Sequence, residues 1–218
     1  MARKIDFVLK FSTYLITNRH LLPPKRDLVE TVEEALRGGV GAVQLREKDL
    51  SSKELYRLAL ELCDITHKYN AIFIVNDRLD IAMAVGADGV HLTTQSLPIR
   101  IVRRIAGENV IIGVSTHSLD EIENAKIQGA DYVTFSPIYF TPSKAKYGPP
   151  QGIEALSEAC KVSGDLSVIA LGGITKDRVK EVVKTGASGI AVVSAIMAAE
   201  DPYKASKELV MRGSSIFK

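Results

Sequence analysis

The chain has 218 residues, of which 46% are apolar and 25% charged, a composition typical of a globular protein. Its net charge of +2 is too small to indicate a nucleic-acid or membrane-surface partner. No run approaches the ~18 apolar residues of a membrane span, and residues 1–10 lack the apolar core of a secretory signal. We therefore expect a cytoplasmic protein with a single domain over residues 1–218. The oligomeric state is left open, with a homo-oligomer as one option.

Short β-branched runs alternate with amphipathic runs along the whole chain. Nearly continuous apolar runs are typical of strands buried on both faces of a parallel sheet. The predicted strands are residues 13–17, 41–45, 71–75, 88–92, 110–114, 131–135, 167–171 and 188–193. The predicted helices are residues 27–38, 52–68, 78–85, 97–106, 118–128, 152–162, 175–185 and 202–211. Ser51, Ser118 and Thr175 are predicted to cap helix starts.

Eight successive βα units predict an α/β fold, the TIM (β/α)8 barrel, with few insertions. An open doubly wound sheet is the competing architecture. It would usually use fewer strands and show a Gly-x-Gly-x-x-Gly turn after the first strand, and this chain has no such turn. The barrel is the favoured fold.

Active-site groups of a barrel gather at the carboxyl ends of its strands, so polar residues at those points are the candidates. Glycines 172 and 173 follow the seventh predicted strand, Val193 ends the eighth, and Ser194 follows it. Bare backbone N–H groups and a short helix N-terminus hold a phosphate at this place in many barrels. The plainer alternative is that Gly172 and Gly173 only form a turn. The matching residues after strand eight favour phosphate binding.

The second strand runs into a segment with two cations. Alternation along an extended chain sends Gln44, Arg46 and Lys48 in the same direction. Such a cluster suits a polyanion such as pyrophosphate, because arginine can bind it through two hydrogen bonds. The alternative is a solvated loop whose cations pair with helix acids such as Glu54.

Asn76 and Asp77 end the third apolar run and place a carboxylate at the barrel mouth. Asp77 could contribute to a Mg²⁺ site, since Mg²⁺ often takes one or two carboxylates plus substrate phosphates. Capping of the helix over 78–85 is an equally good interpretation. Among the histidines, His117 is the best general acid or base, with a solvated loop side chain as the alternative. His91 is expected to be a packed, hydrogen-bonded barrel residue.

At these motifs the chain resembles the thiamine phosphate synthase family and its relative TenI, the thiazole tautomerase. The resemblance rests on Val43-Gln44-Leu45-Arg46-Glu47-Lys48, on Gly113-Val114-Ser115-Thr116-His117, and on residues 14–17, 75–78, 89–92, 136–144, 172–174 and 192–196. For a synthase it implies that the aminopyrimidine pyrophosphate is held by Gln44, Arg46, Lys48, Asn76 and Lys144, with Ser115 near its reacting end. It implies that thiazole phosphate is held by Thr141, Ser143, Gly173, Val193 and Ser194. Asp77 matches the first of two aspartates that bind Mg²⁺.

The sequence departs from the synthase pattern at Ser96, which stands where the second metal-binding aspartate is expected. TenI-like proteins also lack that aspartate, and the histidine corresponding to His117 is implicated in their proton transfer. We therefore expect a TenI-like tautomerase acting on carboxythiazole phosphate without a cofactor, with His117, Ser115 and Lys144 as catalytic residues. The alternative is a Mg²⁺-dependent thiamine phosphate synthase. A third option is a non-catalytic regulator that binds thiazole phosphate.

Overall fold

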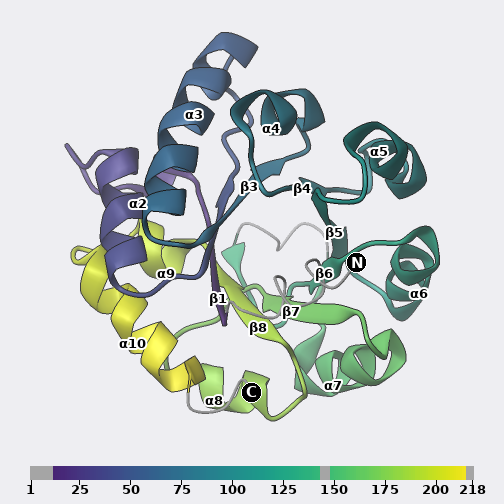
Figure 1. Cartoon of the computed structure of the whole chain (residues 1–218). Coiled ribbons are helices and arrows are strands. Elements are labelled where there is room, and N and C mark those ends of the chain that lie inside the picture. Colours follow the sequence, from purple (N-terminus) through teal and green to yellow (C-terminus); the bar gives the residue numbers. More distant parts are fainter. Residues whose placement is uncertain (1–11, 143–147, 215–218) are drawn as a thin grey trace.

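The computed structural model describes residues 12–142 and 148–214. Eight parallel strands form a closed barrel in chain order, and helices surround it (Figure 1). The strands are β1 (Thr13–Ile16), β2 (Ala42–Leu45), β3 (Ile72–Asn76), β4 (Gly89–Leu92), β5 (Ile111–Thr116), β6 (Tyr132–Phe135), β7 (Ser167–Leu171) and β8 (Gly189–Val192). Tyr14 of β1 lies beside Ala42 of β2 on one side and Ala191 of β8 on the other, which closes the ring. The predicted TIM barrel is confirmed.

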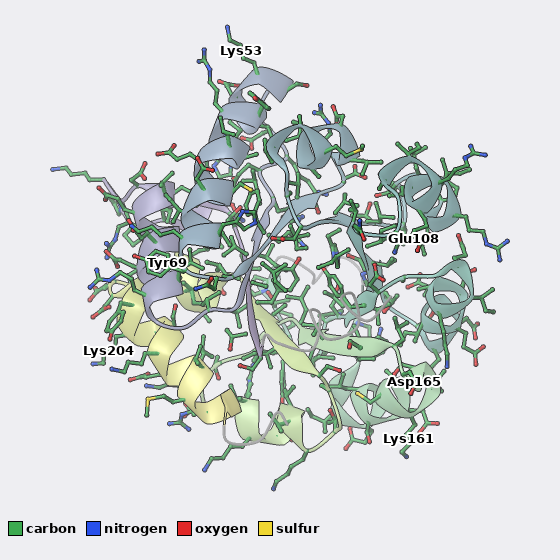
Figure 2. All side chains as sticks on the ribbon, in the orientation of Figure 1. Lys53, Tyr69, Glu108, Lys161, Asp165 and Lys204 are labelled. Atoms are coloured by element: carbon green, nitrogen blue, oxygen red, sulfur yellow. The ribbon has the colours of Figure 1, made fainter. Side chains whose placement is uncertain are left out.

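The helices form the outer layer of the molecule (Figure 1). They are η1 (Arg19–Leu21), α2 (Leu28–Arg37), α3 (Ser52–Lys68), α4 (Leu79–Val85), α5 (Ile99–Ala106), α6 (Leu119–Gln128), α7 (Gly152–Ser163), α8 (Val179–Val183), α9 (Ser194–Met197) and α10 (Pro202–Ser214). Figure 2 shows charged side chains such as Lys53, Glu108 and Lys204 at the outer edge of this layer.

Alternation along each strand divides the apolar side chains between two cores. In β3, Ile72 and Ile74 join the cluster that fills the barrel interior, whereas Phe73 and Val75 join the larger cluster between strands and helices. The interior cluster also contains two tyrosines, Tyr14 and Tyr132, which are fully buried. Burial on both faces explains why the strands read as continuous apolar runs in the sequence.

The predicted helix starts are confirmed at two of three positions. Ser51 and Glu54 form a reciprocal capping box at the start of α3, and the Ser118 side chain accepts from the backbone N–H of Glu121 at the start of α6. The predicted start at Thr175 is wrong. The backbone N–H of Arg178 donates to the carbonyl of Thr175 in a turn, and α8 begins only at Val179.

Candidate functional site

The predicted site residues that the structure describes lie at the carboxyl ends of the strands. Because all eight strands are parallel in one closed barrel, these ends surround a single mouth. Gln44 lies within β2, inside the strand predicted over 41–45, whereas Ser115 was predicted to follow its strand but lies within β5. Their side chains are therefore fixed by strand backbone rather than carried on loops. Two predicted residues, Ser143 and Lys144, lie outside the described residues.

A chain of hydrogen bonds crosses the barrel interior just below this mouth. The Gln44 amide donates to the Tyr14 hydroxyl over 2.7 Å, and that hydroxyl lies 2.9 Å from the Tyr132 hydroxyl. The Tyr132 hydroxyl lies 3.0 Å from Nδ1 of His91, and Nε2 of His91 lies 2.9 Å from Oγ of Ser115. Two predicted site residues on opposite sides of the barrel, Gln44 and Ser115, are therefore connected through three buried side chains.

The ionisation states along this chain follow from burial. Burial, aided by the positive charge of Arg46, lowers the pKa of His91 to about 3, so the imidazole is neutral near pH 7. Burial also raises the pKa of both Tyr14 and Tyr132, so their hydroxyl hydrogens are retained. The prediction that His91 is packed and hydrogen-bonded is confirmed. It is a neutral hydrogen-bonding group rather than a general base.

Glycine 113 makes room for this chain of hydrogen bonds. A Cβ at this position would lie 2.1 Å from Cζ and 2.3 Å from the hydroxyl of Tyr132. The Tyr132 ring therefore occupies the space that any other residue at position 113 would fill. Its edge meets the Tyr14 ring, with centroids 6.0 Å apart and ring planes at 80°. The packing holds both phenols in hydrogen-bonding distance of each other.

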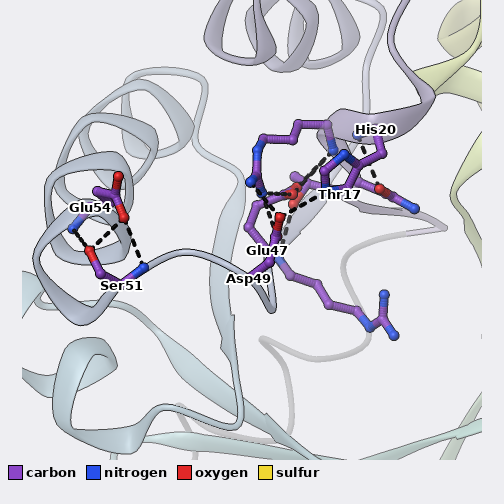
Figure 3. A network of polar contacts seen from close by, with 9 residues as sticks. Thr17, His20, Glu47, Asp49, Ser51 and Glu54 are labelled. Carbon is purple, nitrogen blue, oxygen red and sulfur yellow. Dashed lines mark hydrogen bonds and ion pairs between the residues drawn. The ribbon is translucent and has the colours of Figure 1, made fainter.

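The segment after β2 is held by an ion-pair network with the segment after β1 (Figure 3). Glu47 is buried and accepts from the Arg19 side chain at 3.0 Å, and from the Arg19 backbone N–H. Arg19 also binds Asp49 through two hydrogen bonds of 2.7 Å. Glu47 points to this network, and alternation sends the preceding Arg46 the other way, whereas Lys48 lies exposed in the turn that follows. The backbone N–H of Arg46 is fixed by Thr17 Oγ1 at 2.9 Å.

The alternative interpretation of Arg46 and Lys48 was pairing with Glu54. The Glu54 carboxylate instead accepts from the backbone N–H and hydroxyl of Ser51 (Figure 3). Within residues 12–142 and 148–214, neither cation has an ion pair with a carboxylate. The charge of Arg46 acts instead on the barrel interior, because it contributes to the lowered pKa of His91.

Asp77 lies just past the end of β3 with a φ of 63°, an uncommon backbone conformation for a residue other than glycine. The helix-capping interpretation is wrong, because Arg78 occupies the N-cap of α4 and no side chain caps that helix. The Asp77 carboxylate accepts a short hydrogen bond from the hydroxyl of Ser96. A single carboxylate with a neighbouring hydroxyl suits Mg²⁺ when substrate phosphates supply further oxygens. The described residues contain no group of three or more metal-binding side chains.

His117 follows β5 and is about one-third exposed, at 36% of its side chain. Its Nδ1 lies 3.4 Å from the carboxylate of Glu121, one turn further along the chain. The same carboxylate accepts from the His117 backbone N–H, and Gln151 donates to the His117 carbonyl at 2.8 Å. The backbone is therefore firmly held, while the ring remains accessible to solvent.

The glycines after β7 take conformations that favour glycine, with φ of 105° at Gly172 and 64° at Gly173. A Cβ at Gly172 would lie 2.8 Å from Pro137, and one at Gly173 would lie 2.8 Å from the Phe140 carbonyl oxygen. The two glycines thus allow the segment after β6 to pack directly against the segment after β7. Their role as a tight turn is shown, and phosphate binding remains a prediction.

Arg178 holds this turn in place, although no sequence pattern predicted it. Its guanidinium donates to the Gly173 carbonyl at 2.5 Å and lies over the Tyr139 ring, 4.3 Å from the centroid. The Tyr139 hydroxyl donates to Glu181 at 2.8 Å. Leu171 of β7 lies beside Ala191 of β8, so the glycine turn is next to Val193 and Ser194 at the start of α9. Thr141 lies on the neighbouring segment, after β6.

A closed barrel whose mouth carries two cations, a carboxylate and a buried hydrogen-bond chain has the architecture of a barrel enzyme. A family model described as thiamine monophosphate synthase matches residues 13–196. The chain therefore belongs to the thiamine monophosphate synthase family, which includes the TenI proteins. No helix in the described part of the chain is both long and apolar enough to cross a membrane.

Individual relatives agree with the family. Thiamine-phosphate synthase of Clostridium tetani is 44% identical over 201 residues, which cover 92% of this chain and 95% of the relative. The enzyme of the same name from Pyrococcus furiosus is 43% identical over 202 residues, covering 92% and 93%. The solved structure of thiamine phosphate pyrophosphorylase from Pyrococcus furiosus superposes with a TM-score of 0.86 at 42% identity, covering 96% of this chain and 98% of that one.

These relatives bear on the choice between the two activities. They carry the synthase name, so they support the alternative hypothesis and give no support to a closer kinship with TenI. The expectation of an enzyme of thiamine biosynthesis holds at the level of the family.

Proposed function

We propose that this protein is a thiamine phosphate synthase, which joins an aminopyrimidine pyrophosphate to thiazole phosphate and releases pyrophosphate. The observation that carries the proposal is the presentation of Arg46 and Lys48 at the barrel mouth. Glu47, which lies between them, is buried against Arg19 and leaves both cations available. A tautomerase has no pyrophosphate to bind and would not need them. The names of the relatives support the same activity.

The aminopyrimidine pyrophosphate would lie across the mouth from β2 to β5. Arg46 and Lys48 would bind its phosphates, the arginine through two parallel hydrogen bonds. The other groups proposed for this substrate are Gln44, Asn76, Ser115 and Lys144. Thiazole phosphate would lie against the segments after β6, β7 and β8, where the proposed groups are Thr141, Ser143, Gly172, Gly173, Val193 and Ser194.

In the reaction the bond between the pyrimidine methylene carbon and the pyrophosphate oxygen breaks, and pyrophosphate leaves with the electron pair. The lone pair of the thiazole nitrogen forms the new bond to that carbon. Arg46 and Lys48 stabilise the negative charge that grows on the leaving group, and the two binding regions hold the reacting atoms close together. Mg²⁺, when bound, would add positive charge at the leaving pyrophosphate, and Asp77 is the residue that would hold it.

The direct test mixes the purified protein with both substrates and Mg²⁺ and measures released pyrophosphate and thiamine phosphate. We expect turnover, and we expect Arg46→Ala to lower kcat/KM by about 100-fold because it removes a charged contact to the leaving group. Lys53→Ala is the matched control, since Lys53 is an exposed cation at the outer edge of α3 (Figure 2). Absence of pyrophosphate release from the unaltered protein would reject the proposal.

The metal requirement can be tested at Ser96. Ser96→Asp places a second carboxylate beside Asp77, where the Ser96 hydroxyl now contacts it. We expect the Mg²⁺ concentration needed for half-maximal activity to fall by roughly 10-fold, since two carboxylates bind Mg²⁺ more strongly than one. Asp77→Asn should have the opposite effect. An unchanged Mg²⁺ dependence of activity in both variants would show that Asp77 does not hold the metal.

A second candidate function is the thiazole tautomerase, favoured by Ser96 in place of a carboxylate and by the accessible His117 beside Glu121. The same protein sample should be assayed with carboxythiazole phosphate. If tautomerisation is observed, His117→Ala is expected to abolish it while leaving ligand binding almost intact. Tight binding of thiazole phosphate with turnover in neither assay would indicate the non-catalytic regulator instead.

A further inference from the structure

The glycine turn after β7 is held in place through its carbonyl groups. Backbone N–H groups of the segment after β6 donate to the carbonyls of Leu171 and Gly172, at 2.9 and 3.0 Å. The next carbonyl along the chain, that of Gly173, accepts from Nη1 of Arg178 at 2.5 Å. Three consecutive peptide groups are therefore fixed, the first two by the backbone and the third by a side chain.

The fixed carbonyls determine where the N–H groups of this turn point. A peptide group is planar and trans, so its N–H points away from its carbonyl. The N–H groups concerned belong to Gly172, Gly173 and Ile174, and none of them donates a hydrogen bond within residues 12–142 and 148–214. Ile174 is only 4% exposed, and a buried N–H without a protein partner is costly. Its N–H lies on the side of the peptide opposite Arg178 and can donate to a ligand oxygen.

The Arg178 guanidinium is itself held between two elements. It lies over the Tyr139 ring, 4.3 Å from the centroid, and such a cation is attracted to the face of the ring. The Tyr139 hydroxyl donates to Glu181 at 2.8 Å. Arg178 and Glu181 belong to the start of α8, whereas Tyr139 belongs to the segment after β6. The guanidinium is therefore kept beside the Gly173 carbonyl.

We infer that Arg178 is a positioning residue for thiazole phosphate, because its bond to the Gly173 carbonyl orients the Ile174 N–H towards the phosphate. Arg178 acts from the carbonyl side of this peptide and has no need to touch the ligand. The recognised group is a phosphate monoester, whose oxygens accept from backbone N–H groups. The inference rests on the proposed binding of thiazole phosphate at this turn, beside Ser194, and not on the reaction that follows.

Steady-state kinetics with each substrate varied in turn tests the inference. Arg178→Ala should raise the KM for thiazole phosphate by roughly 10-fold, because one N–H contact to a charged group loses its orientation. The kcat and the KM for the aminopyrimidine pyrophosphate should each change less than about 2-fold. A general loss of structure would alter all three quantities. Equal changes of the two KM values would therefore overturn the inference.

Lys180→Ala is the matched control for the loss of positive charge. Lys180 is an exposed cation of α8 and makes no hydrogen bond to the glycine turn in the described part of the chain. Its removal should change the KM for thiazole phosphate less than about 2-fold, since an exposed charge is largely screened. An increase as large as that of Arg178→Ala would show that Arg178 acts by its charge alone and would contradict a positioning role.

The amide signal of Ile174 provides a measurement that needs no turnover. In NMR titrations of the isotope-labelled protein, thiazole phosphate should shift the Ile174 amide hydrogen downfield, and the shift should be smaller at saturation in Arg178→Ala. Equal shifts in the two proteins, or no shift in the unaltered one, would reject the inference. If the shift is observed but no pyrophosphate is released in the synthase assay, the proposed synthase activity fails and the inference stands.

Discussion

At the scale of single residues, the site depends on the absence of a side chain at Gly113. The Tyr132 ring fills the space where a Cβ would stand, and its hydroxyl reaches both Tyr14 and His91. Tyr132 is fully buried in the barrel interior, so its ring has little room to move away from a new Cβ. The position therefore couples backbone packing to the hydrogen-bond chain.

We predict that Gly113→Ala destabilises the protein by about 1–3 kcal/mol, the usual cost of overpacking a core. The free energy of unfolding in urea measures this. Tyr132→Leu in the same chain should recover part of the loss, because a smaller side chain vacates the contested space. Purely additive effects of the two substitutions would show that the Tyr132 ring is not the group in conflict.

The residues of the site were only partly predictable from the sequence. The ends of apolar runs identified Gln44, Arg46, Asp77 and Ser115, since the carboxyl ends of barrel strands meet at one mouth. Tyr14 lies in a motif that resembles the family, and no sequence pattern connects it with His91. Connecting them requires the shear of the barrel and the packing at a glycine, and neither is visible in a single strand.

At the scale of elements, two Gly-Ala-Asp segments begin strands in the same way. Asp88 precedes β4 and its carboxylate accepts from the backbone N–H of Phe73, while Asp131 precedes β6 and accepts from that of Ile112, both at 2.7 Å. Each carboxylate satisfies a strand N–H at the end of the barrel opposite the site. Asp131 also pairs with Arg103 at 2.6 Å. These contacts stabilise the fold and lie away from the proposed active site.

Replacing Asp131 by Ala should lower the free energy of unfolding by about 2–3 kcal/mol, because a partly buried N–H and the Arg103 guanidinium both lose a charged partner. Urea denaturation measures the change, and the exposed Asp165→Ala serves as the comparison (Figure 2), with an expected change within about 0.5 kcal/mol. Turnover of the Asp131→Ala variant should be unaffected at urea concentrations below its unfolding transition. Equal stability of the two variants would contradict the role of Asp131.

The order of elements could be predicted almost completely, because apolar strands and capped helices leave strong local patterns. The eight predicted strands are those observed, with shifts of one or two residues at their ends. The helix predicted over 175–185 was too long. Its first residues form a turn that brings Arg178 back to the Gly173 carbonyl, a tertiary contact that local sequence does not encode.

At the scale of the whole molecule, the buried neutral His91 makes stability depend on pH. Its pKa is about 3 in the folded protein and ordinarily 6.5, so the unfolded chain binds a proton first as the pH falls. The contribution of His91 is fully present above pH 6.5 and is lost progressively towards pH 3. Among the described residues, the Tyr132 and Ser115 hydroxyls contact the ring, and the positive charge of Arg46 acts on it.

We expect the free energy of unfolding to fall by about 2 kcal/mol between about pH 7 and about pH 5 through His91 alone. Urea titrations at both values measure it, and His91→Gln should show a pH dependence smaller by this amount. Gln offers a donor and an acceptor to the two hydroxyls but does not titrate. Identical pH dependence of the two proteins would mean that the pKa of His91 is the same in the folded and the unfolded protein.

The ion-pair network around Glu47 has a consequence for the cost of binding. Arg19, Glu47 and Asp49 join two adjacent rim segments before any ligand arrives. If Arg46 and Lys48 bind pyrophosphate as proposed, the backbone beneath them would lose little conformational entropy on binding, and more of each contact would be retained as affinity. Arg19→Ala would loosen this network, so it should weaken the proposed binding of pyrophosphate without removing any group proposed to contact it.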